Sequence, residues 1–278
     1  MGMRITLILL VVFVGNLLTA QSLAPAKSPA PAGKVKNVPI TDEDKTSLEN
    51  VIVERFYVAD SLDYLDTLNG RLDKGAVTYR IYIDLKPNYW LQAVYGSSTH
   101  PMIIQTTTRF FNHKLGGVIG YNLNLKYLNA GNILLDSYLT LNSACDRFAG
   151  VILEDDKDST DFLPRRKVFH KRDGFANGNL PLIKPFNLDQ GFFNNDTTAK
   201  FFSVNNGALA GFSGVKAGAM GPTKDNKILI AQLTTNGKLS FELNIQVGTP
   251  SGGVVKYVAR KPIEGEIQYD KLSYKQDK

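Results

Sequence analysis

Residues 76–85 read Ala-Val-Thr-Tyr-Arg-Ile-Tyr-Ile-Asp-Leu, and side chains of two kinds alternate along this stretch. Five apolar side chains would share one face of a strand, and four other side chains would share the opposite face: Val77, Tyr79, Ile81, Ile83 and Leu85 against Thr78, Arg80, Tyr82 and Asp84. Because successive strand residues point to opposite faces, this pattern predicts a strand with one buried face and one face in water.

Similar segments occur along the rest of the chain. Residues 102–111 and 134–141 alternate in the same way, and residues 90–95 and 148–153 are shorter apolar runs that fit interior strands. Residues 254–259 and 267–274 add two closing strands.

A hairpin is expected around Asn236-Gly237, which stands between residues 227–235 and 238–247. Both residues accept the positive φ angles of a type I′ turn. The second arm alternates cleanly, so we expect the two arms to pair.

Helix is expected to be minor, because only residues 41–50 resemble a helix start. Many short strands separated by turns predict an all-β fold, an antiparallel β-sandwich of jelly-roll-like kind, built as one sandwich or as two packed β subdomains. A barrel is the alternative closure of the same strands. Residues 154–200 and 205–221 are expected to be long loops, which are favoured places for a binding site.

The N-terminus predicts export. Arg4 precedes an apolar run over residues 6–14 that is too short to span a bilayer, and Leu18-Thr19-Ala20 offers a cleavage site before Gln21. The expected organisation is a signal peptide at 1–20, a Pro/Ala-rich linker at 21–38 and a β-sandwich domain at 39–278. An uncleaved anchor is the alternative; no transmembrane span is expected after cleavage.

The charge balance of the mature chain is mildly basic. Loss of residues 1–20 removes one base and leaves 31 Lys and Arg against 26 Asp and Glu, a formal charge of +5. This excess is too diffuse to indicate nucleic-acid binding. The single cysteine, Cys145, has no partner for an internal disulfide.

Two charged clusters lie in the first expected loop. Arg165, Arg166 and Lys167 could bind a polyanion, but five acidic residues just upstream make a self-paired, solvated loop the competing interpretation. Among those acids, a loose calcium site would use Asp156, Asp158 and Asp161, although their spacing does not match an EF-type loop. Calcium is the only cofactor that the sequence raises.

A second binding candidate lies on the strands. Trp90 and Tyr95 precede Thr107 and Arg109, so aromatic rings stand near hydroxyl and guanidinium groups. Such combinations suit sugar rings, and the competing interpretation is ordinary strand composition.

No catalytic constellation can be assembled from local motifs. Gly211-Phe212-Ser213-Gly214-Val215 lacks the closing glycine of a nucleophile elbow, and the three histidines have no zinc-ligand spacing. We therefore assign no catalytic residue.

Three segments resemble a known series: residues 77–84 (Val-Thr-Tyr-Arg-Ile-Tyr-Ile-Asp), 91–96 (Leu-Gln-Ala-Val-Tyr-Gly) and 106–112 (Thr-Thr-Thr-Arg-Phe-Phe-Asn). Together they resemble an uncharacterised family of exported β-rich proteins of Bacteroidetes-type bacteria, over most of residues 50–260. The resemblance implies export and a β-rich extracytoplasmic domain. It implies no reaction, ligand or catalytic residue.

These observations favour a secreted or periplasmic, non-catalytic binding or structural module of the cell envelope, whose partner is an envelope glycan or an envelope protein. The alternative is a secreted polysaccharide hydrolase whose carboxylates, such as Asp84 and Asp136, come from separate loops. An assembly subunit is a third hypothesis, and it predicts a long unprotected edge strand.

Overall fold

The structure is a computed structural model that describes residues 38–66, 70–157, 172–178, 180–189, 191–193, 197–212 and 217–277. The expected signal peptide and nearly all of the linker lie outside these residues. Val38–Lys278 form one compact unit. In the part of the chain that is described, no helix is long and apolar enough to cross a membrane.

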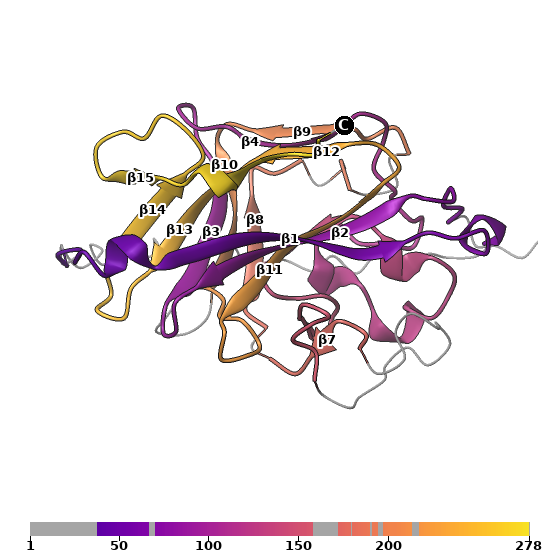
Figure 1. The fold of residues 1–278 in the computed structure, drawn as a ribbon, viewed down its shortest axis with the longest axis horizontal. Coiled ribbons are helices and arrows are strands. Elements are labelled where there is room, and N and C mark those ends of the chain that lie inside the picture. Colours follow the sequence, from indigo (N-terminus) through magenta and orange to yellow (C-terminus); the bar gives the residue numbers. More distant parts are fainter. Residues whose placement is uncertain are drawn as a thin grey trace, which may run out of the picture. The chain divides into compact units, whose positions relative to one another are not determined.

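The fold is all-β and mostly antiparallel, with three main sheets (Figure 1). Sheet A has the order β1-β2-β11-β5, with the bounds Leu48–Val58, Val77–Leu85, Lys227–Thr235 and Tyr138–Leu139. Sheet B has the order β15-β14-β13-β3-β10-β8, with the bounds Glu266–Gln268, Val254–Val258, Asn244–Gly248, Trp90–Gly96, Gly207–Phe212 and Leu182–Phe186. Sheet C has the order β16-β12-β4-β9, with the bounds Ser273–Lys275, Leu239–Glu242, Met102–Thr106 and Phe201–Val204.

Short elements complete the described part of the chain. Strands β6 (Ala149–Gly150) and β7 (Phe175–Ala176) form a small separate sheet. The helical turns are all of 3-10 type, at Asp44–Thr46, Asp63–Leu65, Gly120–Asn122, Leu125–Tyr127, Ile133–Leu135 and Asp270–Leu272. The expected helix at 41–50 is only the first of these turns, because β1 begins at Leu48.

Sheets B and C are two halves of one creased surface. Strand β13 pairs with β3 and β12 pairs with β4, while β10 pairs with β3 and β9 pairs with β4. Three stretches of chain, β3 to β4, β9 to β10 and β12 to β13, therefore run from one sheet into the other. Each is interrupted where it passes between the two sheets. Glycine is required at this crease, because a Cβ on Gly96 would collide with the carbonyl group of Val204.

The main core lies between sheet A and this creased surface. Its buried side chains come from all three sheets, including Ile81, Leu233, Val94, Ile104 and Ile245. The expected β-sandwich is thus confirmed, with the apolar residues of 76–85 facing its core.

The other face of sheet A is also buried, so the prediction that this face meets water is wrong. Thr78, Arg80 and Tyr82 are each 0% exposed. A second core cluster covers them and includes Leu134, Tyr138, Ile152 and Phe175 from the segment after β4. Sheet A is therefore a central layer, and the magenta and pink segment at the lower right of Figure 1 covers part of it.

The predicted hairpin is wrong. Strand β11 belongs to sheet A and β12 to sheet C, so the two arms do not pair, and neither Asn236 nor Gly237 has a positive φ. The hydroxyl groups of Thr235 and Thr106 are 2.8 Å apart, and Thr235 also donates to the carbonyl oxygen of Arg109 at 2.8 Å. These contacts direct the chain from one layer into the other instead of back along β11.

The two segments expected to be long loops contain strands. Residues 154–200 include β7 and β8, and residues 205–221 include β10, which pairs with both β3 and β8. Glycines in the second segment permit close strand contact, because a Cβ on Gly207 would meet the carbonyl oxygen of Phe186 at 2.6 Å.

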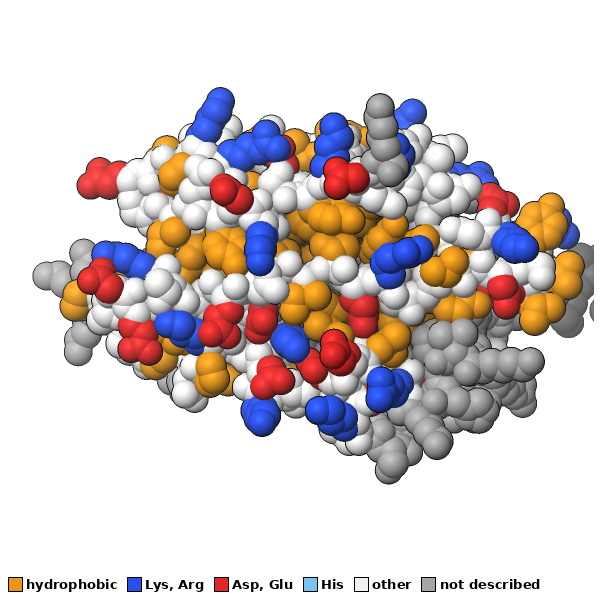
Figure 2. Space-filling model, viewed as in Figure 1, with side chains coloured by type: hydrophobic (Ala, Val, Ile, Leu, Met, Phe, Trp, Pro, Cys, Tyr) orange, Lys and Arg blue, Asp and Glu red, His pale blue; other side chains and the backbone are white. Residues whose placement is uncertain are grey.

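The long edge strand β1 is partly covered. The Tyr269 hydroxyl donates to the carbonyl oxygen of Glu49 at 2.7 Å, and Lys271 Nζ donates to Asn50 Oδ1 at 2.9 Å. Figure 2 shows hydrophobic side chains gathered between β1 and the strands above it, bordered by charged groups. Val53 on β1, Ile267 on β15 and Tyr274 on β16 are partly buried against the main core. Coverage and charged borders are the usual protection of an edge strand.

Candidate functional site

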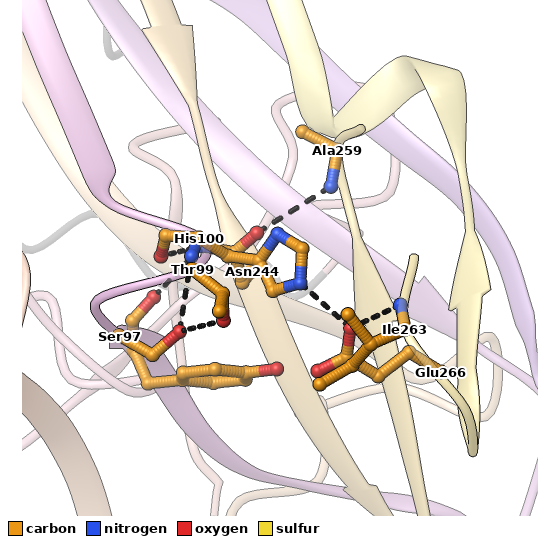
Figure 3. Close-up of polar contacts among 8 residues, drawn as sticks. Ser97, Thr99, His100, Asn244, Ala259, Ile263 and Glu266 are labelled. Atoms are coloured by element: carbon orange, nitrogen blue, oxygen red, sulfur yellow. Dashed lines mark hydrogen bonds and ion pairs between the residues drawn. The ribbon is translucent and has the colours of Figure 1, made fainter. Parts of the chain in front are cut away.

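The crease between sheets B and C is shaped by the loop that joins β3 to β4. Ser97 closes this loop, since its Oγ accepts from His100 N at 3.0 Å and its backbone N–H donates to His100 O at 2.9 Å. Figure 3 shows His100 carried by this loop toward the chain after β14. A five-residue interruption in a strand thus places a histidine between two sheets.

His100 is paired with a carboxylate from the far side of the crease. Its Nε2 lies 2.7 Å from Glu266 Oε2, and the two side chains are only 6% and 7% exposed (Figure 3). The same oxygen accepts from Ile263 N at 3.1 Å. The His100–Glu266 pair therefore links two connections of the fold. One is the turn over residues 259–266 between β14 and β15, and the other is the loop between β3 and β4.

Asn244 makes a second set of hydrogen bonds across the crease. Its Nδ2 donates to His100 O at 2.9 Å and to Tyr95 O at 3.2 Å, and its Oδ1 accepts from Ala259 N at 3.4 Å (Figure 3). Asn244 is 2% exposed. One buried amide thus ties three chain segments together, which fixes where the turn after Ala259 begins.

Tyr95 is half-buried and contributes a buried hydroxyl group to the same region. Its hydroxyl oxygen has no hydrogen-bond partner among the described residues. Burial and the nearby charge of Glu266 raise the pKa of Tyr95 to about 12. The phenol therefore stays neutral and does not present its hydroxyl to a ligand in water.

Two neighbouring hollows open above the crease and the outer face of sheet C. One has a volume of about 300 Å³ and the other about 270 Å³, and both are lined by Glu242 and Arg260. Arg260 Nη2 lies 3.0 Å from Glu242 Oε1 and donates to Ser273 Oγ at 3.1 Å. The side chain of Arg260 is nevertheless 62% exposed. The two hollows thus share the Glu242–Arg260 pair and its accessible guanidinium group, and we call them together the sheet C groove.

Apolar side chains contribute to the groove lining. Phe201 on β9 lines it and is 53% exposed. Tyr274 stacks on Phe241 with ring centroids 5.3 Å apart and an interplanar angle of 21°. Polar groups on strands of the same sheet, Gln105 on β4 and Ser240 on β12, also line this hollow. Aromatic faces beside hydrogen-bonding groups on rigid strands suit the binding of a sugar ring.

The structure does not bring the predicted strand residues together in one site. Trp90 is 5% exposed and packs against Gly248, where a Cβ would collide with the indole ring. Tyr95 lies at the opposite end of β3, at the crease. The prediction that both rings present a binding face is therefore wrong for Trp90, and the Tyr95 hydroxyl is enclosed.

Thr107 and Arg109 lie beyond the end of β4. The Thr107 hydroxyl accepts from Lys238 N at 2.9 Å, so it supports the connection between sheets A and C. Arg109 lines a separate hollow of about 100 Å³ together with Arg71 and Asn236. This hollow shares no lining residue with the sheet C groove.

The predicted charged clusters fall mostly outside the described residues. Arg165, Arg166, Lys167, Asp158 and Asp161 are not described. Asp156 is 3% exposed, and its Oδ2 accepts from Gly174 N at 2.8 Å. Within the described ranges, no group of three or more His, Cys, Asp or Glu side chains is arranged to hold a metal ion.

The carboxylates considered for a hydrolase are not brought together. Asp84 pairs in register with Lys227, whereas the backbone of Asp136 accepts from Gln232, five residues further along β11 and thus roughly 16 Å away. Asp136 is 0% exposed and accepts from His113 N at 2.6 Å and Gly117 N at 2.8 Å. Burial raises the pKa of Asp136. Its observed contacts hold the loop over residues 113–117.

A second polar cluster is enclosed on the covered face of sheet A. Arg80 Nε donates to Gln232 Oε1 at 2.9 Å, Nη1 donates to Gly174 O at 2.7 Å, and the guanidinium carbon lies 3.6 Å from the centroid of the Phe56 ring. Glu54 lies directly opposite Arg80 in the pairing of β1 with β2. Burial raises the pKa of Glu54, and the charge of Arg80 opposes that shift.

Sequence reasoning missed Glu242 and Arg260 as site residues. The outward direction of Ser240 and Glu242 follows from the alternation of residues 239–247. The strand partners do not follow from it, and pairing with β4 and β16 is what opens this face beside Arg260.

Comparisons with protein-family models, with curated proteins and with solved structures gave no match for this chain.

Proposed function

We propose that this chain is a non-catalytic binding module of the cell envelope that holds a glycan in the sheet C groove. The observation that supports this most is that the two hollows share Glu242 and Arg260, and that the exposed ring of Phe201 lines one of them. An open groove with an aromatic platform and fixed polar groups is suited to a chain of sugar rings.

The rigidity of the site supports a binding role. Most groove residues stand on strands of sheet C, and the His100–Glu266 and Asn244 contacts fix the turn that carries Arg260. Side chains that are already ordered lose little entropy when a ligand binds. With the export signal expected at residues 1–20, the ligand would be met outside the cytoplasm.

The test is retention on a panel of immobilised envelope polysaccharides. Phe201→Ala should abolish or strongly weaken retention of the polymer that binds the native protein. Phe186→Ala is the matched control, because Phe186 is 46% exposed on β8 and does not line the groove. Equal retention of both variants, or no retention of any polymer by the native protein, would argue against this function.

The competing hydrolase function is tested in the same incubation. The carboxylates beside the groove are each paired with a base, Glu242 with Arg260 and Glu266 with His100. This arrangement supports binding over hydrolysis. Release of reducing ends from a retained polysaccharide would overturn the non-catalytic assignment.

The export proposal has its own measurement. Intact mass of the chain recovered from outside the cytoplasm should correspond to a mature protein that begins at Gln21. Retention of residues 1–20 on a membrane-bound protein would instead support the uncleaved anchor.

A further inference from the structure

The lining of the sheet C groove is unequal in charge. Three basic side chains line the two hollows, Arg260, Lys261 and Lys275, against one acidic side chain, Glu242. Figure 2 shows Lys and Arg side chains along the top of the molecule, with Asp and Glu side chains between them. The lining of the groove therefore carries two more basic than acidic side chains, which favours an anionic ligand.

Arg260 is held in a position to receive a carboxylate. It contacts a hydroxyl group on one strand and the Glu242 carboxylate on another, so its direction is set before any ligand arrives. Glu242 is 36% exposed, and a surface ion pair of this kind contributes only about 0–1 kcal/mol. A ligand carboxylate can therefore displace it at little cost.

Lys261 gives a second, independent indication. It has a φ of 51°, in the left-handed region that favours glycine or asparagine. The other residues with positive φ in the described ranges are asparagines and glycines. A lysine held in this conformation at the rim of the groove is a local strain of the kind found at binding sites.

We infer that the groove selects glycans that carry carboxylate groups, as a chain of uronic acids does. This inference rests on the proposed function. Arg260 binds one sugar carboxylate through two parallel hydrogen bonds in place of Glu242, while Lys261 and Lys275 attract the carboxylates of neighbouring sugars. Phe201 packs against a ring of the same chain.

The experiment compares one polymer with and without its charge. Polygalacturonate and its full methyl ester share the same sugar chain, and their affinities for the native protein are measured by titration calorimetry. Polygalacturonate should bind at least about tenfold more tightly, because each charge-assisted hydrogen bond is roughly twice as strong as a neutral one. Dextran sulfate serves as a polyanion without carboxylates.

Two variants of the ion pair should change the affinity in opposite directions. Arg260→Gln should weaken polygalacturonate binding about tenfold, whereas Glu242→Gln should tighten it about threefold by removing the internal competitor. Lys224→Gln is the matched control, because Lys224 is exposed and does not line the groove. Near-UV circular dichroism verifies that each variant remains folded.

The possible results distinguish a failure of the carboxylate inference from a failure of the proposed glycan-binding function. Equal affinity for polygalacturonate and its methyl ester would overturn the inference and leave the proposed function standing. Equal binding of dextran sulfate would show that any polyanion suffices and would also overturn it. Weaker binding by both Arg260→Gln and Glu242→Gln would show that the ion pair maintains the shape of the groove, and it would overturn the replacement of Glu242 by a ligand carboxylate. Failure of every polysaccharide to bind would overturn the proposed function itself.

Discussion

Two arginines of this protein, Arg80 and Arg260, have a glutamate as neighbour on an adjoining strand or turn, yet their surroundings are opposite. Arg80 is 0% exposed, and two of its nitrogens donate to groups of the protein. The side chain of Arg260 is 62% exposed, and only its Nη2 is engaged in the contacts described above. Burial closes the Arg80 guanidinium off from ligands in solvent, although its Nη2 has no hydrogen-bond partner among the described residues. An oriented and exposed charge such as that of Arg260 remains available to a ligand.

The largest expected effect is on the enclosed cluster. Arg80→Leu should lower the free energy of unfolding by about 3–5 kcal/mol, because it removes the hydrogen bonds to Gln232 and Gly174 and leaves the partly buried Glu54 without the opposite charge on the neighbouring strand. The measurement is chemical denaturation followed by circular dichroism. Arg260→Leu, its exposed counterpart, should change stability by less than about 1 kcal/mol.

A double variant tests the cause. Arg80→Leu with Glu54→Leu should recover part of the loss, because no uncompensated buried charge remains. If the double variant were less stable than Arg80→Leu alone, the packing of the arginine side chain and not its charge would be the dominant contribution.

Two neighbouring phenylalanines on opposite faces of β9 allow a buried and an exposed side chain to be compared within one strand. Phe202 is 3% exposed and its ring centroid lies 5.2 Å from that of Phe192, so Phe202→Ala should cost about 3–5 kcal/mol of stability. Phe201→Ala should cost less than about 1 kcal/mol and act on glycan retention instead. Similar losses of melting temperature in both variants would contradict the assignment of Phe201 to a ligand.

A pH series tests the enclosed cluster by a smaller effect. Burial raises the pKa of Glu54 above its ordinary 4.5, so the native state binds this proton more tightly than the unfolded chain does. Its contribution to stability is therefore full below about pH 4.5 and is lost as the pH rises through the native pKa.

Glu54→Gln supplies the reference for that series, because glutamine does not titrate. The free energy of unfolding of the native protein, relative to this variant, should fall between pH 4 and pH 8. A difference that rises with pH would show that Arg80 outweighs burial.

The smallest effect concerns Lys261. Lys261→Gly should raise the free energy of unfolding by up to about 1 kcal/mol, because glycine adopts a positive φ without strain, and the same change should weaken binding of a carboxylated glycan. Lys256→Gly on β14 is the control and should instead lower the free energy of unfolding, because glycine weakens the interior of a strand. A melting temperature lowered by Lys261→Gly would contradict strain at this position.

Local pattern predicted some strands well, overestimated others and did not predict their partners: the strand expected at 134–141 is a 3-10 turn followed by the two-residue β5, and the strand expected at 148–153 is the two-residue β6. The alternation of residues 76–85 located β2 to within one residue. It could not show that Thr78, Arg80 and Tyr82 are covered, because the segment that covers them lies more than 50 residues further along the chain. Similarly, Asn236-Gly237 permits a tight turn but does not require one, and contacts of Thr235 with Thr106 decided the path.

The candidate site was less accessible to sequence reasoning than the fold. Arg109 and Tyr95 were singled out because they lie near one another in sequence, and the structure places them in different surroundings. The groove instead joins Glu242, Arg260 and Ser273 through pairing of β12 with β16 and through the turn after β14.

The alternation of side chains is sufficient to predict that this chain forms mostly antiparallel strands with little helix, because the period of two follows from the geometry of each residue and its neighbours. Which strands pair, which arginine is enclosed and where a groove opens become visible in the folded chain alone. Those outcomes depend on contacts between residues far apart in the chain, and a local pattern of side chains carries no information about such contacts.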